Sequence, residues 1–198
     1  MTKIVGITGG IGSGKTTFSN HLKKLGFLVH ESDRVVSEIY TKPKKQFLSF
    51  IKEKISRDAI KHNKINKAEI ANVIFNNNTI KRLLERRIHK EVQSSREAFI
   101  KKYTKKKIKI IFADIPLLFE NKLEKNFDLV ICIISSKKNR SKRVLKNKKF
   151  TKENLNKIFK AQTTDKERKK RSQIIINNNK TKKDFVFSVE KVLIRLTK

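Results

Sequence analysis

Residues 9–16 read Gly-Gly-Ile-Gly-Ser-Gly-Lys-Thr, and this run restricts the fold of the 198-residue chain more than any other feature. It matches the pattern G-x-x-x-x-G-K-[ST] of a phosphate-binding loop, or P-loop, which joins a buried strand to a helix. The β-branched segment Lys3–Thr8 predicts that strand. Phe18, Leu22 and Leu25 repeat on one face of the following helix, so the chain begins as a parallel α/β sheet.

Further apolar segments predict four more strands of this sheet. They span residues 27–30, 108–113, 129–134 and 174–176. The third of these is apolar throughout, as a strand buried on both faces should be. Residues 34–103 show helical periodicity and contain no convincing strand. Within them, Asn66 with Glu69 three residues later resembles a capping box, and Asn76–Asn78 reads as a loop.

The residue types of the P-loop suit phosphate chemistry. Glycines let the backbone curl so that successive N–H groups face a phosphate chain, and the helix N-terminus adds partial positive charge. We expect Lys15 to reach the β- and γ-phosphates and the Thr16 hydroxyl to ligate Mg²⁺. Asp114, after an apolar strand, either holds Mg²⁺ through water or caps the following loop. Asp33, after the second strand, either accepts a proton from an acceptor hydroxyl or caps a helix beginning at Arg34.

The balance of 50 Lys+Arg against 18 Asp+Glu gives a formal net charge of +32. Such a charge suits nucleic acid, but the basic residues are spread over the whole chain, without a basic motif interleaved with aromatic residues. We therefore favour compositional drift as its source and expect no dedicated nucleic-acid partner. No apolar run approaches the roughly 18 residues of a membrane span, so no membrane association is expected. The single cysteine, Cys132, excludes an intramolecular disulfide, fits a cytoplasmic location and reads as an inert core residue.

Several classes of P-loop protein lack support in the sequence. The chain has neither the guanine-reading N-K-x-D of GTPases nor a D-x-x-G, and it is short for a helicase. A small-molecule kinase needs a group that holds an acceptor hydroxyl near the γ-phosphate, and Asp33 suits that task. A nucleoside or nucleotide kinase and a nucleic-acid-stimulated P-loop ATPase remain as alternatives.

A family resemblance covers essentially the whole chain in order and spacing. The residues that carry it are Ile7–Thr17, Asp33, Pro116-Leu117-Leu118-Phe119-Glu120, Ala161-Gln162, Arg168 and Ile176-Asn177-Asn178. On these residues the chain resembles the dephospho-coenzyme A kinases. The resemblance implies transfer of the γ-phosphate of ATP to the 3′-hydroxyl of dephospho-coenzyme A, the last step of coenzyme A synthesis. ATP and dephospho-coenzyme A are then the partners, and Mg²⁺ is the cofactor.

The fold expected from the elements and the resemblance is α/β, with a three-layer P-loop NTPase-like core around a five-stranded parallel sheet. The core takes residues 1–33, 104–135 and 172–198. A helical insertion, residues 34–103, is expected to bind the acceptor. A basic lid with its following helices takes residues 136–171.

The resemblance also implies roles for single residues. Asp33 is the catalytic base, and Lys15 and Arg143 are catalytic cations, Arg143 from the lid. The implied ATP-binding residues are Gly9, Gly10, Ile11, Gly12, Ser13, Gly14, Lys15, Thr16, Thr17, Arg143 and Asn178, the last near the adenine. The implied acceptor-binding residues are Asp33, Leu117, Leu118, Phe119 and Glu120. From the residues alone, Arg143 reads more readily as a solvated charge among basic neighbours.

The sequence departs from the family pattern in several places. Lys90 follows His89 where the family usually has proline, so the helix there should continue. Asn147 replaces a second lid arginine, and Lys148 and Lys149 replace acidic residues. Before the last strand, Ser172-Gln173 replaces an Ala-Asp pair. These departures affect the lid and the affinity for ATP rather than the reaction.

Overall fold

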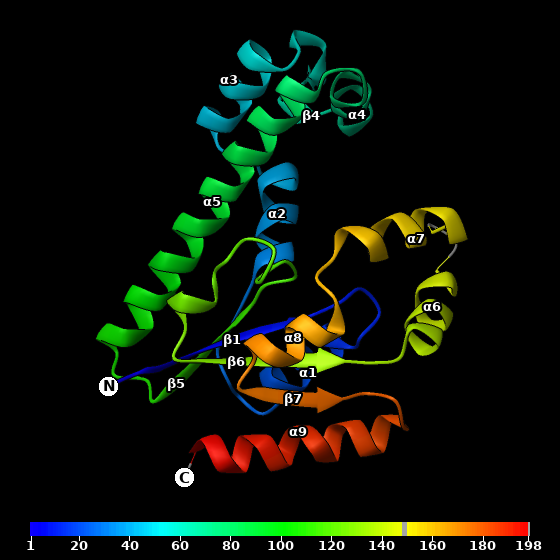
Figure 1. The fold of residues 1–198 in the computed structure, drawn as a ribbon. Coiled ribbons are helices and arrows are strands. Elements are labelled where there is room, and N and C mark those ends of the chain that lie inside the picture. The colour runs from blue at the N-terminus through cyan, green and yellow to red at the C-terminus, as the bar shows by residue number, and fades with distance from the viewer. Residues whose placement is uncertain (148–149, 198) are drawn as a thin grey trace. The chain divides into compact units, whose positions relative to one another are not determined.

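The computed structural model describes residues 1–147 and 150–197 of the chain. Its larger sheet has five strands, which are β1 (Lys3–Gly9), β2 (Val29–Glu31), β5 (Ile110–Asp114), β6 (Leu129–Ile134) and β7 (Ile174–Asn177). Their order is β2-β5-β1-β6-β7, and every pairing is parallel (Figure 1). The predicted five-stranded parallel sheet is therefore confirmed.

Helices follow most of the strands along the chain. They are α1 (Lys15–Lys24), α2 (Ser32–Thr41), α3 (Lys45–Lys54), α4 (Lys67–Asn76), α5 (Asn78–Lys105), α6 (Lys137–Leu145), α7 (Lys152–Ala161), α8 (Asp165–Arg171) and α9 (Lys182–Thr197). Short 3₁₀ helices, η1 (Arg57–Ala59) and η2 (Glu124–Asn126), interrupt two of the connections. Helix α5 runs unbroken through His89-Lys90, as the absence of proline predicts. Within residues 1–147 and 150–197, none of the helices combines the length and the apolar character that a membrane crossing requires.

The side chains of the sheet alternate between two cores, because neighbouring residues of a strand face opposite ways. On one face, Ile131 of β6 packs with Phe18 of α1 and Phe185 of α9. Cys132, the next residue of β6, packs on the other face with Leu118 from the segment after β5. Helix α8 also contacts β6. The sheet is thus buried on both sides, which explains why β6 is apolar throughout.

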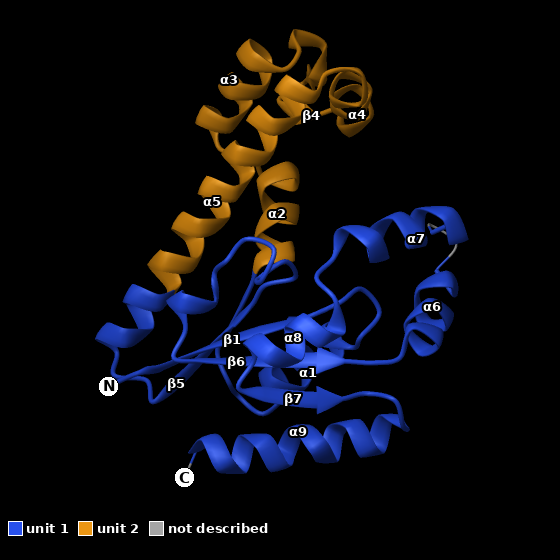
Figure 2. Cartoon of the chain, in the orientation of Figure 1, with its two compact units in different colours: residues 1–31, 100–198 blue, residues 32–99 orange. Residues whose placement is uncertain are grey.

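The chain divides into two compact units (Figure 2). One comprises residues 1–31 and 100–198 and contains the five-stranded sheet. The other comprises residues 32–99 and has a core of its own, in which Phe47, Ile51 and Leu84 are buried. The boundary at residue 99 falls within α5, so one helix belongs to both units.

The expectation that residues 34–103 contain no strand is wrong. A small antiparallel hairpin joins β3 (Ile60–Lys61) to β4 (Lys64–Ile65). His62 and Asn63 form its turn with φ values of 49° and 58°, the left-handed conformation that two-residue hairpin turns require. Strands of two residues are too short to show an alternating pattern, and His-Asn is not a strong turn signal. The sequence therefore does not indicate this hairpin.

Two asparagine predictions in this unit need correction in detail. Asn66 caps α4 as predicted, because its Oδ1 accepts from the N–H groups of Ala68 and Glu69 at 3.2 and 3.3 Å. The capping box is not closed, however, since the Asn66 N–H donates to the Ala59 carbonyl at 2.8 Å. The predicted loop at Asn76–Asn78 shrinks to Asn77 alone, whose side chain caps α5.

Cys132 should resist thiol reagents in the folded protein. Its side chain is 0% exposed, and burial raises the pKa of the thiol to about 11. Only about a thousandth of such a thiol is ionised at pH 8, and the thiolate is the reactive form. We expect a dithionitrobenzoate assay at pH 8 to show negligible labelling of native protein and one fast thiol per chain in guanidinium. Rapid labelling of the native protein would contradict the core assignment.

Candidate active site

The P-loop connects the end of β1 to the start of α1, as the sequence predicts. Gly14, which precedes α1, has a φ of 107°, and a Cβ added there would lie 2.2 Å from the Asn178 Nδ2. Gly12 has a φ of 74°, and a Cβ there would lie 2.8 Å from the Arg140 carbonyl oxygen. Both backbone conformation and space therefore require glycine at these two positions.

Not every amide of the loop is available to a phosphate. The Ile11 N–H donates to the Gln162 Oε1 at 3.1 Å, and the Ser13 N–H donates to the Gly10 carbonyl at 3.0 Å. Two N–H groups of the loop are therefore engaged within the protein. The N–H groups of Gly12 and of the first residues of α1 are the candidate phosphate donors.

Lys15, the first residue of α1, forms an ion pair with Asp114 at the end of β5. The Ser19 Oγ donates to the other oxygen of the Asp114 carboxylate at 2.6 Å. Both partners lie on α1, so Asp114 does not cap the loop after β5, and that alternative is wrong. The Asp114 residue is 5% exposed, which places a buried carboxylate directly beside the P-loop lysine.

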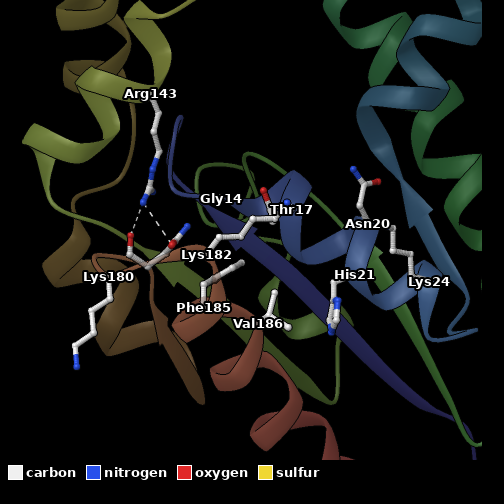
Figure 3. Close-up of a pocket in the computed structure, with 11 residues that line it drawn as sticks. Gly14, Thr17, Asn20, His21, Lys24, Arg143, Lys180, Lys182, Phe185 and Val186 are labelled. Carbon is white, nitrogen blue, oxygen red and sulfur yellow. Dashed lines mark hydrogen bonds between the residues drawn. The ribbon is translucent and has the colours of Figure 1, made fainter.

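Arg143 of α6 is not a solvated charge. Its Nη1 donates to the carbonyls of Gly12 and Ser13 at 3.2 and 3.4 Å. Its Nη2 donates to the Asn178 carbonyl at 2.7 Å (Figure 3). The Asn178 Nδ2 in turn donates to the Ser13 carbonyl at 2.7 Å. Arg143 and Asn178 therefore hold the carbonyl side of the P-loop.

A cavity of about 680 Å³ opens beside this cluster. Its walls include Gly14, Thr17, Arg143, Asn178, Lys180 and Phe185 (Figure 3). It therefore combines the start of α1 with basic side chains and an aromatic ring, a lining that suits an anionic nucleotide.

A second cluster, which the sequence analysis missed, surrounds Arg140 of α6. This residue is 7% exposed, and its Nε donates to the Ile11 carbonyl at 2.9 Å. Its guanidinium also contacts the Gln162 Oε1 at 3.3 Å and the Asp165 Oδ1 at 3.4 Å. Burial lowers the pKa of Arg140, and the Asp165 carboxylate opposes that shift. Arg140 and Arg143 are three residues apart and therefore lie on one face of α6, but their spacing alone does not mark that face as buried.

Most side chains of the segment Leu117–Glu120 contact other parts of the protein. Leu118 and Phe119 are 0% and 2% exposed and belong to the core, whereas Leu117 is exposed. The Glu120 Oε1 accepts from the Thr163 N–H at 2.7 Å and pairs with Arg168 at 3.5 Å. Among these four residues, Leu117 has the most accessible side chain for an acceptor, and acceptor binding here stays a prediction.

Asp33 and Thr16 both occupy the second position of a helix. Asp33 is exposed in the first turn of α2, which begins at Ser32. The alternative in which Asp33 caps a helix beginning at Arg34 is therefore wrong. Thr16 is exposed in the first turn of α1. Lys148 and Lys149 of the predicted lid lie outside the described residues.

The oxygen donors near the loop suit Mg²⁺ rather than a softer metal. The Thr16 hydroxyl and the Asp114 carboxylate are hard ligands of the kind that Mg²⁺ prefers. Over residues 1–147 and 150–197, no group of three or more His, Cys, Asp or Glu side chains could hold a metal.

Comparisons with known proteins agree on one family. The family model described as dephospho-CoA kinase matches residues 3–184. The dephospho-CoA kinase of Fusobacterium nucleatum subsp. nucleatum is 32% identical over 191 residues, which cover 95% of each chain. The dephospho-CoA kinase of Buchnera aphidicola subsp. Schizaphis graminum is 36% identical over 187 residues, which cover 91% of this chain and 85% of that one.

Solved structures share the fold. The dephospho-CoA kinase from Campylobacter jejuni matches with a TM-score of 0.76 at 24% identity, covering 99% of this chain and 98% of that one. A shikimate kinase from Acinetobacter baumannii matches with a TM-score of 0.51 at 12% identity, covering 100% and 94% of the two chains. The fold is thus that of the P-loop kinases. Because the family model and both relatives extend over most of the sequence, this chain belongs to the dephospho-CoA kinase family.

Proposed function

We propose that this protein transfers the γ-phosphate of ATP to the 3′-hydroxyl of dephospho-coenzyme A, giving coenzyme A and ADP. The observation that carries the proposal is the family match over residues 3–184, which includes a complete P-loop with Lys15 at the start of α1. Both substrates are anionic, and a net charge of +32 favours their approach. The buried, unpaired Cys132 fits a reducing compartment, so we place the reaction in the cytoplasm.

Different residues of the chain bind the phosphates and accept the proton. The N–H groups of Gly12 and of the start of α1 bind the phosphates, and Lys15 neutralises charge on the transferring group. To do so, the Lys15 ammonium exchanges its pairing with Asp114 for one with the phosphates. Arg143 supports the loop from its carbonyl side, through Gly12 and Ser13. Asp33 orients the 3′-hydroxyl and accepts its proton late in the transfer.

The Thr16 hydroxyl, with Asp114 through a water molecule, would hold Mg²⁺, which when bound neutralises charge on the phosphate oxygens. Asn178 has both functional groups of its side chain engaged by Ser13 and Arg143. We therefore assign it to shaping the nucleotide cavity rather than to a direct hydrogen bond with adenine.

Mass spectrometry of dephospho-coenzyme A incubated with ATP, Mg²⁺ and the protein tests the reaction directly. We expect a product heavier by one phosphoryl group, formed only when all three are present. A panel of nucleosides and nucleotides as acceptors, read by ADP release, tests the alternative small-molecule kinases. Addition of DNA or RNA tests the ATPase alternative. Turnover of another acceptor in preference to dephospho-coenzyme A would overturn the proposal.

Thr16→Val should raise the Mg²⁺ concentration that gives half-maximal turnover by about tenfold, because it removes one charge-assisted contact of the metal. Thr16→Ser keeps the hydroxyl and serves as the matched control, with a metal dependence near that of the wild type. The measurement is a Mg²⁺ titration of initial rates at saturating ATP. An unchanged metal dependence in Thr16→Val would remove Thr16 from the metal site.

A further inference from the structure

We infer that Arg140 is a positioning residue that aims the Gly12 N–H at the phosphates of the nucleotide. Its Nε donates to the Ile11 carbonyl at 2.9 Å. In a trans peptide the C=O and the next N–H point in opposite directions, and no described peptide bond is cis. A side chain that holds the Ile11 carbonyl on the outside of the loop therefore fixes the Gly12 N–H toward its inside.

Several contacts fix Arg140 itself in this position. The guanidinium lies over the Phe159 ring, with the central carbon 4.7 Å from the ring centroid. Gln162 bridges it to the loop, since the Gln162 Oε1 contacts the Arg140 Nη2 and also accepts from the Ile11 N–H. Both backbone groups of Ile11 are thus held by this cluster. The position of Ile11 is therefore defined by side chains of α6 and of Gln162, which directly follows α7.

Asp165 links this contact to a second buried arginine. Its Oδ1 contacts the Arg140 Nη1 at 3.4 Å and the Arg168 Nη1 at 2.9 Å. Arg168 is 1% exposed and pairs in turn with Glu120. A Cβ added to Gly10 would lie 2.4 Å from the Arg140 Nη2 and 2.8 Å from the Arg168 Nη1. Two guanidinium groups therefore lie against the tip of the P-loop, and the two carboxylates balance their charges.

This balance decides between two roles for Arg140. A cation that bound phosphate directly would need an excess of positive charge and open donors. The Arg140 donors point instead to a carbonyl, an amide oxygen and a carboxylate, all within the protein. Its contribution to nucleotide binding is therefore indirect, through the orientation of the Ile11–Gly12 peptide. Arg143, three residues later, has the same relation to the Gly12 and Ser13 carbonyls, so α6 supplies two successive supports for the loop.

The test compares the KM values for ATP and for dephospho-coenzyme A in Arg140→Gln. This kinetic comparison rests on the proposed function. We expect the KM for ATP to rise about tenfold, the effect of weakening one charge-assisted hydrogen bond to phosphate. The KM for dephospho-coenzyme A should stay within about twofold. Arg140→Lys keeps the charge but not the fork that reaches Ile11, Gln162 and Asp165 together, so it should recover only part of the loss. Lys138→Gln, an equal charge change at an exposed position of α6, is the matched control and should behave as the wild type.

A second variant keeps the inference testable if Arg140→Gln does not fold. Asp165→Asn removes one partner of Arg140 and should raise the KM for ATP about threefold. In the double variant Arg140→Gln/Asp165→Asn, the effect of Asp165→Asn should be smaller than in the wild-type background, because part of it acts through Arg140. Titration calorimetry with ATP and inorganic triphosphate decides the same question without turnover. Calorimetry therefore tests this inference independently of the proposed function. If the proposed function failed, the wild-type protein would form no coenzyme A.

Four results would overturn the inference. The first is a KM and a dissociation constant for ATP within twofold of the wild type in both Arg140→Gln and Asp165→Asn. The second is full recovery in Arg140→Lys, which would point to charge rather than geometry. The third is an equal loss in Lys138→Gln. The fourth is a parallel rise in the KM for both substrates with a lowered melting temperature, the signature of general structural damage.

Discussion

Lys15→Ala should lower turnover by about 10³-fold, because it removes the cation that neutralises charge on the transferring phosphoryl group. The structure adds a second expected effect. Lys15 and Asp114 pair with side-chain exposures of 12% and 7%, so the variant leaves a buried carboxylate without its cation. Breaking such a pair costs about 3–5 kcal/mol of unfolding free energy. Initial rates and urea unfolding of the same preparation measure the two effects.

The double variant Lys15→Ala/Asp114→Asn separates chemistry from stability. An amide at position 114 removes the buried charge and still accepts from the Ser19 hydroxyl, so most of the lost stability should return. Turnover should remain low, because no cation faces the phosphates. Recovery of both properties in the double variant would mean that Lys15 is structural. Turnover within tenfold of the wild type in Lys15→Ala would contradict its place in the site.

The strands of the sheet could be predicted because buried strands have apolar sequences. Leu129–Ile134 is buried on both faces and reads as an apolar run, and the motif at residues 9–16 places β1 and α1 on either side of the loop. The strand order was not predictable in the same way. β1 pairs with β5 and β6, each more than a hundred residues away. The apolar sequence of a strand does not indicate which strands it will pair with.

Helix α8 shows a different limit. Asp165–Arg171 reads Asp-Lys-Glu-Arg-Lys-Lys-Arg, with no apolar residue to form a stripe, and its one buried side chain is Arg168. Its start nevertheless carries a capping signal. Thr164 accepts from the Glu167 N–H at 3.2 Å, and the spacing Thr-x-x-Glu is visible in the sequence.

The arginines of the site were the least predictable part. In a chain with 50 Lys+Arg, no local pattern separates a cation that points inward from one that faces solvent. Arg140 and Arg168 are buried because carboxylates and carbonyls from distant segments meet them, among them Glu120 and Ile11. Only the three-dimensional arrangement brings those partners together. The burial of Leu118 and Phe119, to which the family resemblance gives an acceptor role, likewise depends on packing against β6.

Asp33→Asn should lower turnover by about 10²–10³-fold with little change in stability. A general base contributes about 10²–10⁴-fold, or roughly 3–5 kcal/mol of barrier. In the loose transition state of phosphoryl transfer the hydroxyl keeps its proton until late, which favours the lower half of that range. The KM for ATP should change little, because the P-loop and Lys15 hold the phosphates. Asparagine keeps the size of the side chain, so the acceptor still fits.

The position of Asp33 in α2 makes this result interpretable. Because α2 begins at Ser32, Asp33 lies within the first turn, where a carboxylate gains about 0.3–1 kcal/mol from the helix dipole. A structural role therefore predicts a slightly lowered melting temperature with unchanged turnover. A catalytic role predicts a large loss of turnover with little change in melting temperature. Glu38→Gln, an exposed carboxylate on the same helix, is the matched control and should alter neither property. If Glu38→Gln slows turnover as much as Asp33→Asn, the effect belongs to the negative charge of α2 as a whole. A large loss confined to Asp33→Asn assigns proton acceptance to this one carboxylate, because both variants remove one negative charge from an exposed position of α2.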